Sequence, residues 1–488
     1  MTDGFDIAAP DPAGMVASLS SLGYSLEAAV ADLVDNSVSA RATDIEVVFT
    51  WAGEDSWVAV VDNGSGMSLP DLVTAMTPAA RGPGTERSAD DLGRFGLGLK
   101  TASFSQARQL TVTSRPPGET WHTRTWDLNM VEASREWRLM HDADPETSRL
   151  LDLFRRDRGS GTIVLWRRLN GYGADGTDPD QTTQRQFYED ASRVERHLGM
   201  VFARFLKDVD LRVQNQTVAA WDPFLTGHPS LQRLPPEDLA FGSSSVRVEA
   251  YVLPSAQRLS KEEYLAAGGP GGWLRQQGFY VYRRKRLILA GDWLGLQGMR
   301  QEEKFNLARI SIEVPAELDA EWSVDVRKSK VVPPVALRRH LQRIAKRARE
   351  QAADVIRHRG QIAARRHGSA FVYLWRVDRP DGRIKCRINR DHPLVREALR
   401  TGDERGKVVK ALLTLLEETV PVEALRVIHE ADAADDPVPF TGAPSQDQED
   451  VARALLAALI NQGRSPHDAR SMIRNMDPFS RLDGFWNK

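Results

Sequence analysis

The chain has 488 residues, which exceeds what one ordinary hydrophobic core needs and predicts roughly two to four packed units. Its 41% apolar and 27% charged residues exclude a disordered chain, and its single cysteine, Cys386, excludes an internal disulfide framework and favours a reducing compartment. A net charge of −2 gives no overall attraction to nucleic acid, and the lack of a long apolar run excludes a membrane span and predicts a cytoplasmic protein.

The first predicted elements are one helix and two strands. From Ser25 to Ala40 the apolar residues recur at helical spacing, and Ser25 is a suitable N-cap, so we expect a helix with one face in a core. The β-branched runs 44–49 and 57–61 are bounded by Gly, Asp or Asn, which predicts two paired strands. Asp62 then lies where the second strand ends.

A loop and the rest of a sandwich follow. Residues Pro78 to Leu92 are rich in Gly, Ser, Pro and charge without apolar periodicity, which predicts a loop, and its place before a glycine cluster suggests a lid. Further strands are predicted at 110–114 and 162–166, and a helix over 183–208. One α/β sandwich to about residue 215 accounts for these elements.

The second half of the chain changes composition several times. Strands are predicted at 246–253, 279–282 and 310–314, a loop at 268–272, a mixture of strands and helices at 369–430, a linker at 432–450 and a helix at 451–461. The helical stretch 335–366 holds ten Lys or Arg and two acids. We therefore predict four parts, which are 1–215, 216–335, 336–368 and 369–488.

Asp32 and Asn36 lie four residues apart on the first helix and so share one face. The amide oxygen of Asn36 is a hard donor suited to Mg²⁺, and the carboxylate of Asp32 could orient or deprotonate an attacking water. The pair taken alone also fits a polar helix face in solvent.

Two glycine-containing runs complete a possible nucleotide pocket. A buried Asp62 could accept a hydrogen bond from an exocyclic amine such as that of adenine, and Gly64 and Gly66 would let the backbone approach a flat ring. The run Gly93 to Lys100 offers backbone N–H groups, a helix start and a positive charge for phosphates. It lacks the ending of a P-loop and follows a loop, which argues against P-loop and Rossmann folds. The Asp62 run alone also fits an ordinary turn.

The order and spacing of these blocks resemble those of the GHKL ATPases, the superfamily of gyrase-type topoisomerases, heat-shock chaperones, histidine kinases and MutL. Within that superfamily, the residues of the blocks are most similar to those of bacterial MORC-like and MutL-like members. The resemblance implies an α+β protein with a Bergerat-type sandwich, then a transducer-like (S5-type) α+β domain and a small C-terminal α/β region. It implies ATP and Mg²⁺ as cofactors, with Asn36 on the metal. The ligand-binding positions carried over are Asn36, Asp62, Gly64, Gly66, Met67, Gly93, Phe95, Gly96, Leu97, Gly98, Leu99, Lys100 and Thr162.

The catalytic positions follow from the same resemblance. Asp32 stands where related ATPases usually carry Glu, so hydrolysis could be slow, and Glu27 is the second candidate for the base. The segment 322–330 resembles the loop that reaches a lysine back to the γ-phosphate, for which Lys330 is favoured over Lys328, although either also fits an exposed surface lysine.

The implied function is a nucleotide-gated clamp. The resemblance implies an ATP-dependent homodimer, with residues 1–24 available for strand exchange, and a DNA-associated setting of the restriction or antiphage kind with nuclease, helicase or methyltransferase partners. The basic stretch 335–366 could bind DNA phosphates or could be a solvated connecting helix. A chaperone-like ATPase acting on protein clients and an ATP-binding scaffold with little turnover remain as alternatives.

Overall fold

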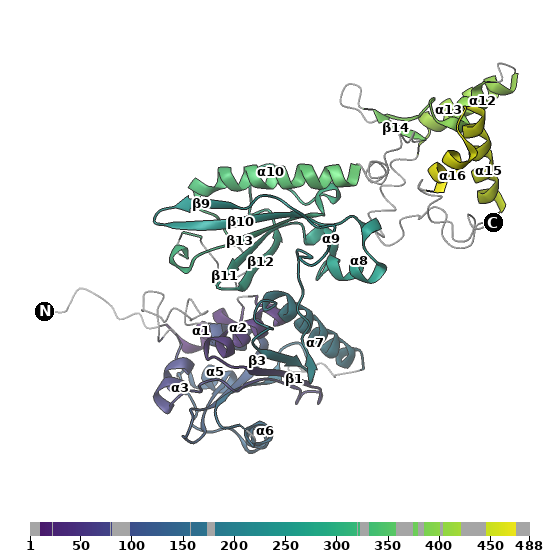
Figure 1. Ribbon diagram of the computed structural model, residues 1–488. Helices are drawn as coiled ribbons and strands as arrows, with labels where there is room; N and C mark the ends of the chain where they lie inside the picture. Colours follow the sequence, from purple (N-terminus) through teal and green to yellow (C-terminus); the bar gives the residue numbers. More distant parts are fainter. Residues whose placement is uncertain are drawn as a thin grey trace. The chain divides into compact units, whose positions relative to one another are not determined.

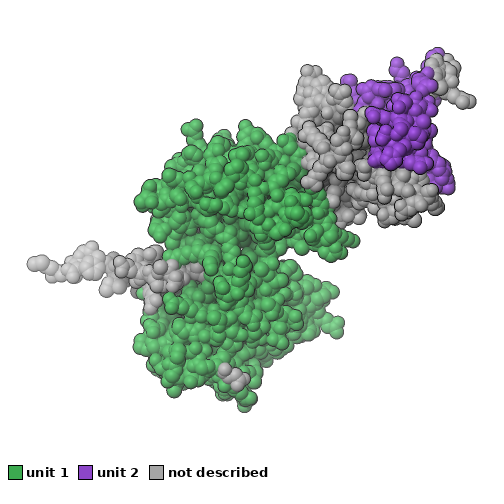
Figure 2. Space-filling view, viewed as in Figure 1, with its two compact units in different colours: residues 1–356 green, residues 357–488 purple. Residues whose placement is uncertain are grey.

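A computed structural model describes most of the chain in two compact units, residues 1–356 and 357–488 (Figure 2). The described residues are 10–21, 23–78, 80, 98–156, 158–172, 181–319, 321–322, 331–357, 374–378, 385–400, 404–420 and 446–474. Unit 1 contains two sheets, each with its own helices (Figure 1). In the described part of the chain, no helix combines the length and apolar character that a membrane crossing needs.

The first sheet has seven strands in the order β4-β3-β5-β2-β1-β6-β7. Only the pair β1 and β6 is parallel among these neighbours. The bounds are β1 Asp44–Thr50, β2 Trp57–Asp62, β3 Ala107–Arg115, β4 His122–Asp127, β5 Gly161–Leu169, β6 Asp210–Val213 and β7 Gln216–Thr217. This is a mixed α+β domain, as expected.

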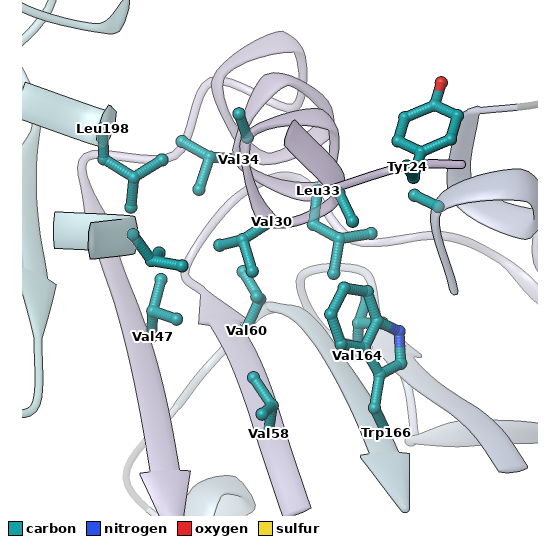
Figure 3. Close-up of a cluster of buried hydrophobic side chains, with 14 of the residues drawn as sticks. Tyr24, Val30, Leu33, Val34, Val47, Val58, Val60, Val164, Trp166 and Leu198 are labelled. Atoms are coloured by element: carbon teal, nitrogen blue, oxygen red, sulfur yellow. The ribbon is translucent and has the colours of Figure 1, made fainter. Parts of the chain in front are cut away.

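Helices cover both faces of this sheet (Figure 1). The helices are α1 Pro12–Ser20, α2 Leu26–Ser39, α3 Leu69–Met76, α4 Gly98–Gln106, α5 Leu128–Ser134, α6 Pro145–Arg155 and α7 Gln181–Val201. Helix α2 begins at a Ser25 side chain that accepts the N–H of Ala28, and its Val30 and Val34 lie over Val60 and Val47 of the sheet (Figure 3). On the opposite face, α6 packs its own apolar side chains against the sheet.

Because β2 is buried on both faces, its end is a rigid place for a functional side chain. All six of its residues are buried, with Val58 and Val60 in the cluster under α2, and Ala59 and Val61 in the cluster under α6. Asp62 closes this strand.

The second sheet has six strands, ordered β12-β11-β13-β10-β8 with β9 beside β10. The bounds are β8 Gln232–Arg233, β9 Glu237–Phe241, β10 Ser244–Val252, β11 Gly278–Arg283, β12 Arg286–Asp292 and β13 Ala308–Glu313, with helices α8 Lys261–Gly268, α9 Gly272–Arg275 and α10 Val335–Arg357 and 3₁₀ turns at Ala256–Arg258, Glu303–Phe305 and Ala316–Leu318. Helix α10 packs onto this sheet through Leu337, Leu341 and Ile344. The basic stretch is therefore amphipathic where it is described.

Unit 2 has a two-stranded sheet and a small helical core. Its elements are β14 Trp375–Asp378, β15 Lys385–Ile388, α12 Pro393–Leu399, α13 Glu404–Glu418, α15 Gln446–Asn461 and α16 Pro466–Arg474. Leu455 and Leu459 of α15 pack against Ala469 and Ile473 of α16.

Several element boundaries differ from the expected ones. The helix expected over 183–208 ends at Val201, and α15 begins at Gln446, inside the expected linker. Of the expected lid at 78–92, only Pro78 and Ala80 lie within the described residues. Residues 12–20 of the segment considered for strand exchange form helix α1, and residues 1–9 lie outside the described part.

Candidate active site

Asp62 is a buried carboxylate held from three directions. Its Oδ1 accepts the backbone N–H groups of Gly64 at 2.9 Å and Thr162 at 3.1 Å, and its Oδ2 accepts the hydroxyl of Ser37 at 2.8 Å. Burial raises the pKa of Asp62, although these hydrogen bonds and the charge of Arg158 act against the rise. A carboxylate oxygen has two lone pairs, so Oδ2 can accept a second donor, such as an amine, while Ser37 stays bound.

Thr162 is fixed by the same corner of the sheet. It pairs with Asp62 across β5 and β2, and its hydroxyl lies 2.8 Å from that of Ser114 on β3. The backbone N–H of Met67 donates to the Ser114 hydroxyl, also at 2.8 Å. The structure therefore brings the predicted residues Asp62, Met67 and Thr162 together, with Ser114 as an unexpected link.

The two glycines after Asp62 are required by the chain itself. A Cβ on Gly64 would lie 2.8 Å from the Cβ of Ala40, and one on Gly66, where φ is +65°, would lie 2.0 Å from the carbonyl oxygen of Arg115. In this structure the two glycines allow the turn to lie close to Ala40 and to the backbone of Arg115. Their expected role, a close approach of the backbone to a flat ring, stays a prediction.

Asp32 and Asn36 have different surroundings although they share a helix face. Asp32 is buried, and its Oδ2 accepts the hydroxyl of Tyr24 at 3.1 Å. A Cβ built on Gly98 would lie 3.6 Å from the same oxygen, so helix α4 begins beside this carboxylate. Asn36 is exposed, while the seven residues before it on α2 are buried. Its amide is therefore accessible to a ligand.

The glycine-rich run is described only from its last three residues onward. Leu99 packs against the main core, and the buried amine of Lys100 donates to the carbonyl oxygen of Ala75 at 2.8 Å, at the end of α3. Burial lowers the pKa of Lys100 to about 8. The expected role of the Lys100 charge, to bind phosphates, stays a prediction. Predicted positions that lie outside the described residues are Gly93, Phe95, Gly96, Leu97, Lys328 and Lys330.

The alternative base, Glu27, is occupied by an ion pair. Its carboxylate accepts from Arg193 of α7 at 3.0 Å. Burial acts to raise the pKa of Glu27, but hydrogen bonds from its own backbone and from Arg193 outweigh burial and lower it. Because Glu27 is paired with Arg193 and Asp32 lies beside the start of α4, the geometry favours Asp32 over Glu27 as the base.

Sequence reasoning missed the residues that hold the acids in place. Arg286 of β12 donates from Nε to both carboxylate oxygens of Asp35, at 2.6 and 2.7 Å, and its Nη2 lies 3.9 Å from Oδ1 of Asp32. Asp35 could have been noticed beside Asn36, and Ser37 directly after it. The contact of Arg286 with Asp35 gives no local signal, because the two residues are 251 positions apart in the sequence.

Comparison with known proteins agrees with this arrangement. Residues 24–160, which include Asp32, Asn36, Asp62 and Gly98, match the family profile of the histidine kinase-, DNA gyrase B-, and HSP90-like ATPases. The N-terminal domain belongs to the GHKL ATPases. The GHKL domain is similar in sequence to MutL and MORC proteins, as expected.

Two curated relatives show the extent of the likeness. The DNA mismatch repair protein MutL of Paramagnetospirillum magneticum is 34% identical over 132 residues, which is 26% of this chain and 20% of that protein. The ATPase morc-1 of Caenorhabditis elegans is 29% identical over 90 residues, which is 18% of this chain and 10% of that protein. The chain therefore covers a fifth or less of the length of either relative.

Proposed function

We propose that this protein binds and hydrolyses ATP at the site formed by α2, the β2 and β5 strand ends and the start of α4. The observation that carries the proposal is the arrangement around Asp62, whose carboxylate is held by Gly64, Thr162 and Ser37 while Oδ2 keeps capacity for an amine. The Asp32 and Asn36 side chains come from the helix that also supplies Ser37. Helix α2 thus connects the proposed adenine contact to the proposed site of phosphate hydrolysis.

The chain's own residues would divide the work as follows. Asp62 accepts the exocyclic amine of adenine, and the start of α4 at Gly98 places backbone N–H groups near the phosphates. Asp32, which lies beside Gly98, orients the attacking water and takes its proton. Lys330 or Lys328 would contact the γ-phosphate, as the resemblance implies.

Asn36 is suited to a metal that accompanies the nucleotide. Its exposed amide offers one hard oxygen, and Mg²⁺ usually takes one or two protein oxygens and fills its shell with phosphate and water. Bound there, the ion would neutralise charge on the phosphates. The residues present fit this group.

We further propose that nucleotide binding closes a dimeric clamp that acts on DNA, in a restriction-like or antiphage setting. The outer face of α10 supports a DNA partner, since Arg339, Lys346 and Arg347 are exposed there. One relative, MutL, is a DNA mismatch repair protein. A client-protein ATPase would show no salt-dependent DNA binding.

Substitution of Asp32 by Asn tests the proposed hydrolysis. Asn keeps the shape of the side chain but cannot take a proton, so ATP binding should persist while phosphate release falls by a factor of about 100 or more. Release of phosphate from the pure protein and the affinity for a non-hydrolysable ATP analogue measure the two effects. Retained turnover in Asp32→Asn would show that another group is the base, and no turnover in the wild-type chain would favour an ATP-binding scaffold.

A further inference from the structure

The hairpin of β11 and β12 inserts a side chain from the second sheet into the GHKL domain. Its two-residue turn consists of Arg284 and Lys285, with φ of 49° and 69°, which is the left-handed pair that matches the twist of a tight hairpin. Tyr282 and Leu287 on either side of the turn belong to the same core cluster as α2. Arg286, the first residue of β12, is therefore held firmly against the GHKL domain.

Arg286 is buried between two acids of α2. Its side chain is 6% exposed, and those of Asp32 and Asp35 are 7% and 2% exposed. The Nε group binds both oxygens of Asp35, and the Nη1 group donates to the carbonyl oxygen of Leu287 at 3.0 Å. The guanidinium carbon also lies 5.7 Å from the centroid of the Phe202 ring.

These contacts give the two acids different relations to Arg286. Asp35 makes the short hydrogen bonds and so anchors the guanidinium, whereas Asp32 lies 3.9 Å away, beyond hydrogen-bond distance but well within the range of its charge. Oδ2 of Asp32 accepts the hydroxyl of Tyr24, so Arg286 and Tyr24 both act on the orientation of this carboxylate. The positive charge of Arg286 therefore acts on both carboxylates.

We propose that Arg286 is a positioning residue for Asp32, through which the second sheet controls turnover. The inference rests on the proposed ATPase function. Because Arg286 belongs to the second sheet and Asp32 to the GHKL domain, any movement of the hairpin relative to α2 changes both the orientation of Asp32 and the positive charge next to it. Through Arg286 the second sheet thus controls the orientation of Asp32, and Arg286 itself does not contact the nucleotide.

Kinetics of Arg286→Gln test this role against a merely structural one. Loss of the guanidinium should lower kcat about tenfold or more while KM and the affinity for a non-hydrolysable ATP analogue change less than about threefold. Arg286→Lys keeps the charge without the planar guanidinium and should recover part of kcat. Arg283→Gln is the matched control, because Arg283 lies in the same hairpin and pairs with Asp319 at 2.7 Å rather than with an acid of α2. Its kcat should stay near that of the wild type.

A double variant separates positioning from folding. Arg286→Gln takes the charge of Arg286 away from the buried Asp35, which can unfold the domain, whereas Arg286→Gln with Asp35→Asn removes both charges and allows a neutral hydrogen bond. We expect the double variant to unfold at a temperature near that of the wild type and still to show the low kcat. Recovery of kcat in the double variant, or loss of analogue affinity in parallel with kcat, would overturn the inference.

The same measurements distinguish this inference from the function on which it depends. If the wild type hydrolyses ATP, Asp32→Asn does not, and Arg286→Gln turns over at the wild-type rate, then only the role of Arg286 is refuted. If the wild type releases no phosphate, both the proposed function and the role of Arg286 fail together.

Discussion

The backbone at Gly66 has a φ of +65°, and a Cβ there would lie 2.0 Å from the carbonyl oxygen of Arg115. At Gly66 the turn after β2 therefore packs directly against the end of β3, near Asp62. Both backbone strain and steric overlap oppose any side chain at this position.

We expect Gly66→Ala to lower stability by about 3 kcal/mol or more, because the strain of a positive φ adds to a backbone clash that cannot relax by a side-chain rotation. Gly118→Ala is the control, since Gly118 has a φ of +80° and open space around its Cβ position, and should cost about 1 kcal/mol. Thermal unfolding midpoints compare the two variants. Equal decreases would show that the contact with Arg115 does not constrain the turn.

His197 should make the fold sensitive to acid. Burial, followed by the positive charge of Arg286, lowers its pKa to about 4, while the charges of Glu27 and Asp35 oppose the decrease. Because the folded-state pKa lies below the unfolded value of 6.5, the stabilisation is complete above pH 6.5 and is lost as the pH falls from there towards 4. The loss between pH 7.5 and pH 5 is about 2 kcal/mol.

Replacement of His197 by Gln removes this titration and leaves a neutral polar side chain. The thermal unfolding midpoint of His197→Gln should therefore fall less between pH 7.5 and pH 5 than that of the wild type, since all other titrating groups are common to both proteins. An equal fall in both would show that His197 is protonated as readily in the folded chain as in the unfolded one.

At the scale of elements, α10 has two different faces. Leu337, Leu341 and Ile344 bury one face on the second sheet. On the exposed face Arg343 pairs with Glu237, while Arg339, Lys346 and Arg347 have no ion pair with another described residue. Unpaired arginine and lysine side chains can exchange counterions for phosphates at little cost, which suits a nucleic-acid backbone.

We expect weaker binding to long duplex DNA when Gln replaces Arg339, Lys346 and Arg347. The slope of log affinity against log salt concentration should also become shallower, by an amount that corresponds to the loss of up to about three phosphate contacts. Fluorescence anisotropy at several salt concentrations, with a non-hydrolysable ATP analogue present, measures both effects. Replacement of Arg185, Arg196 and Lys207, which are exposed elsewhere on unit 1, gives the same change in net charge as a control. Identical salt dependence in the two triple variants would rule out a specific role for α10.

Elements with strong local patterns were predictable from sequence. The apolar spacing in α2 and the β-branched runs of β1, β2 and β5 gave their positions within a few residues. The strand β4, with the sequence His-Thr-Arg-Thr-Trp-Asp, was missed because its residues lack apolar alternation, and it is a strand through its pairing with β3.

The candidate site divides in the same way. Asp62, its glycines and the Asp32 and Asn36 pair lie in short motifs, so sequence alone could propose them. The Arg286 contact with Asp35 depends on how two sheets pack, and the placement of Lys100 against Ala75 depends on how α4 meets α3. Neither has a local pattern, which is why both required the structure.

At the scale of the whole molecule, the proposed clamp requires that nucleotide changes how two copies associate. Helix α4 begins beside Asp32, so a nucleotide bound there would contact both α2 and α4, and Arg286 connects the same acid to the second sheet. The free energy of nucleotide binding at this site can in this way stabilise one arrangement of both sheets and favour association of two such chains.

Light scattering coupled to size exclusion tests this association. The chain of 54.4 kDa should be monomeric without nucleotide and should double in mass with a non-hydrolysable ATP analogue. Asp32→Asn, which keeps the binding contacts but lacks the base, should remain dimeric in ATP itself, whereas the wild type should return to monomer as ATP is consumed. Asp62→Asn replaces one acceptor oxygen by an NH₂ donor, which must face either the adenine amine or the N–H groups of Gly64 and Thr162. Because two donors then oppose each other, this variant should bind the analogue weakly and stay monomeric at the same analogue concentration. A mass that does not change when analogue binding is saturated would separate ATP binding from dimerisation and refute the clamp.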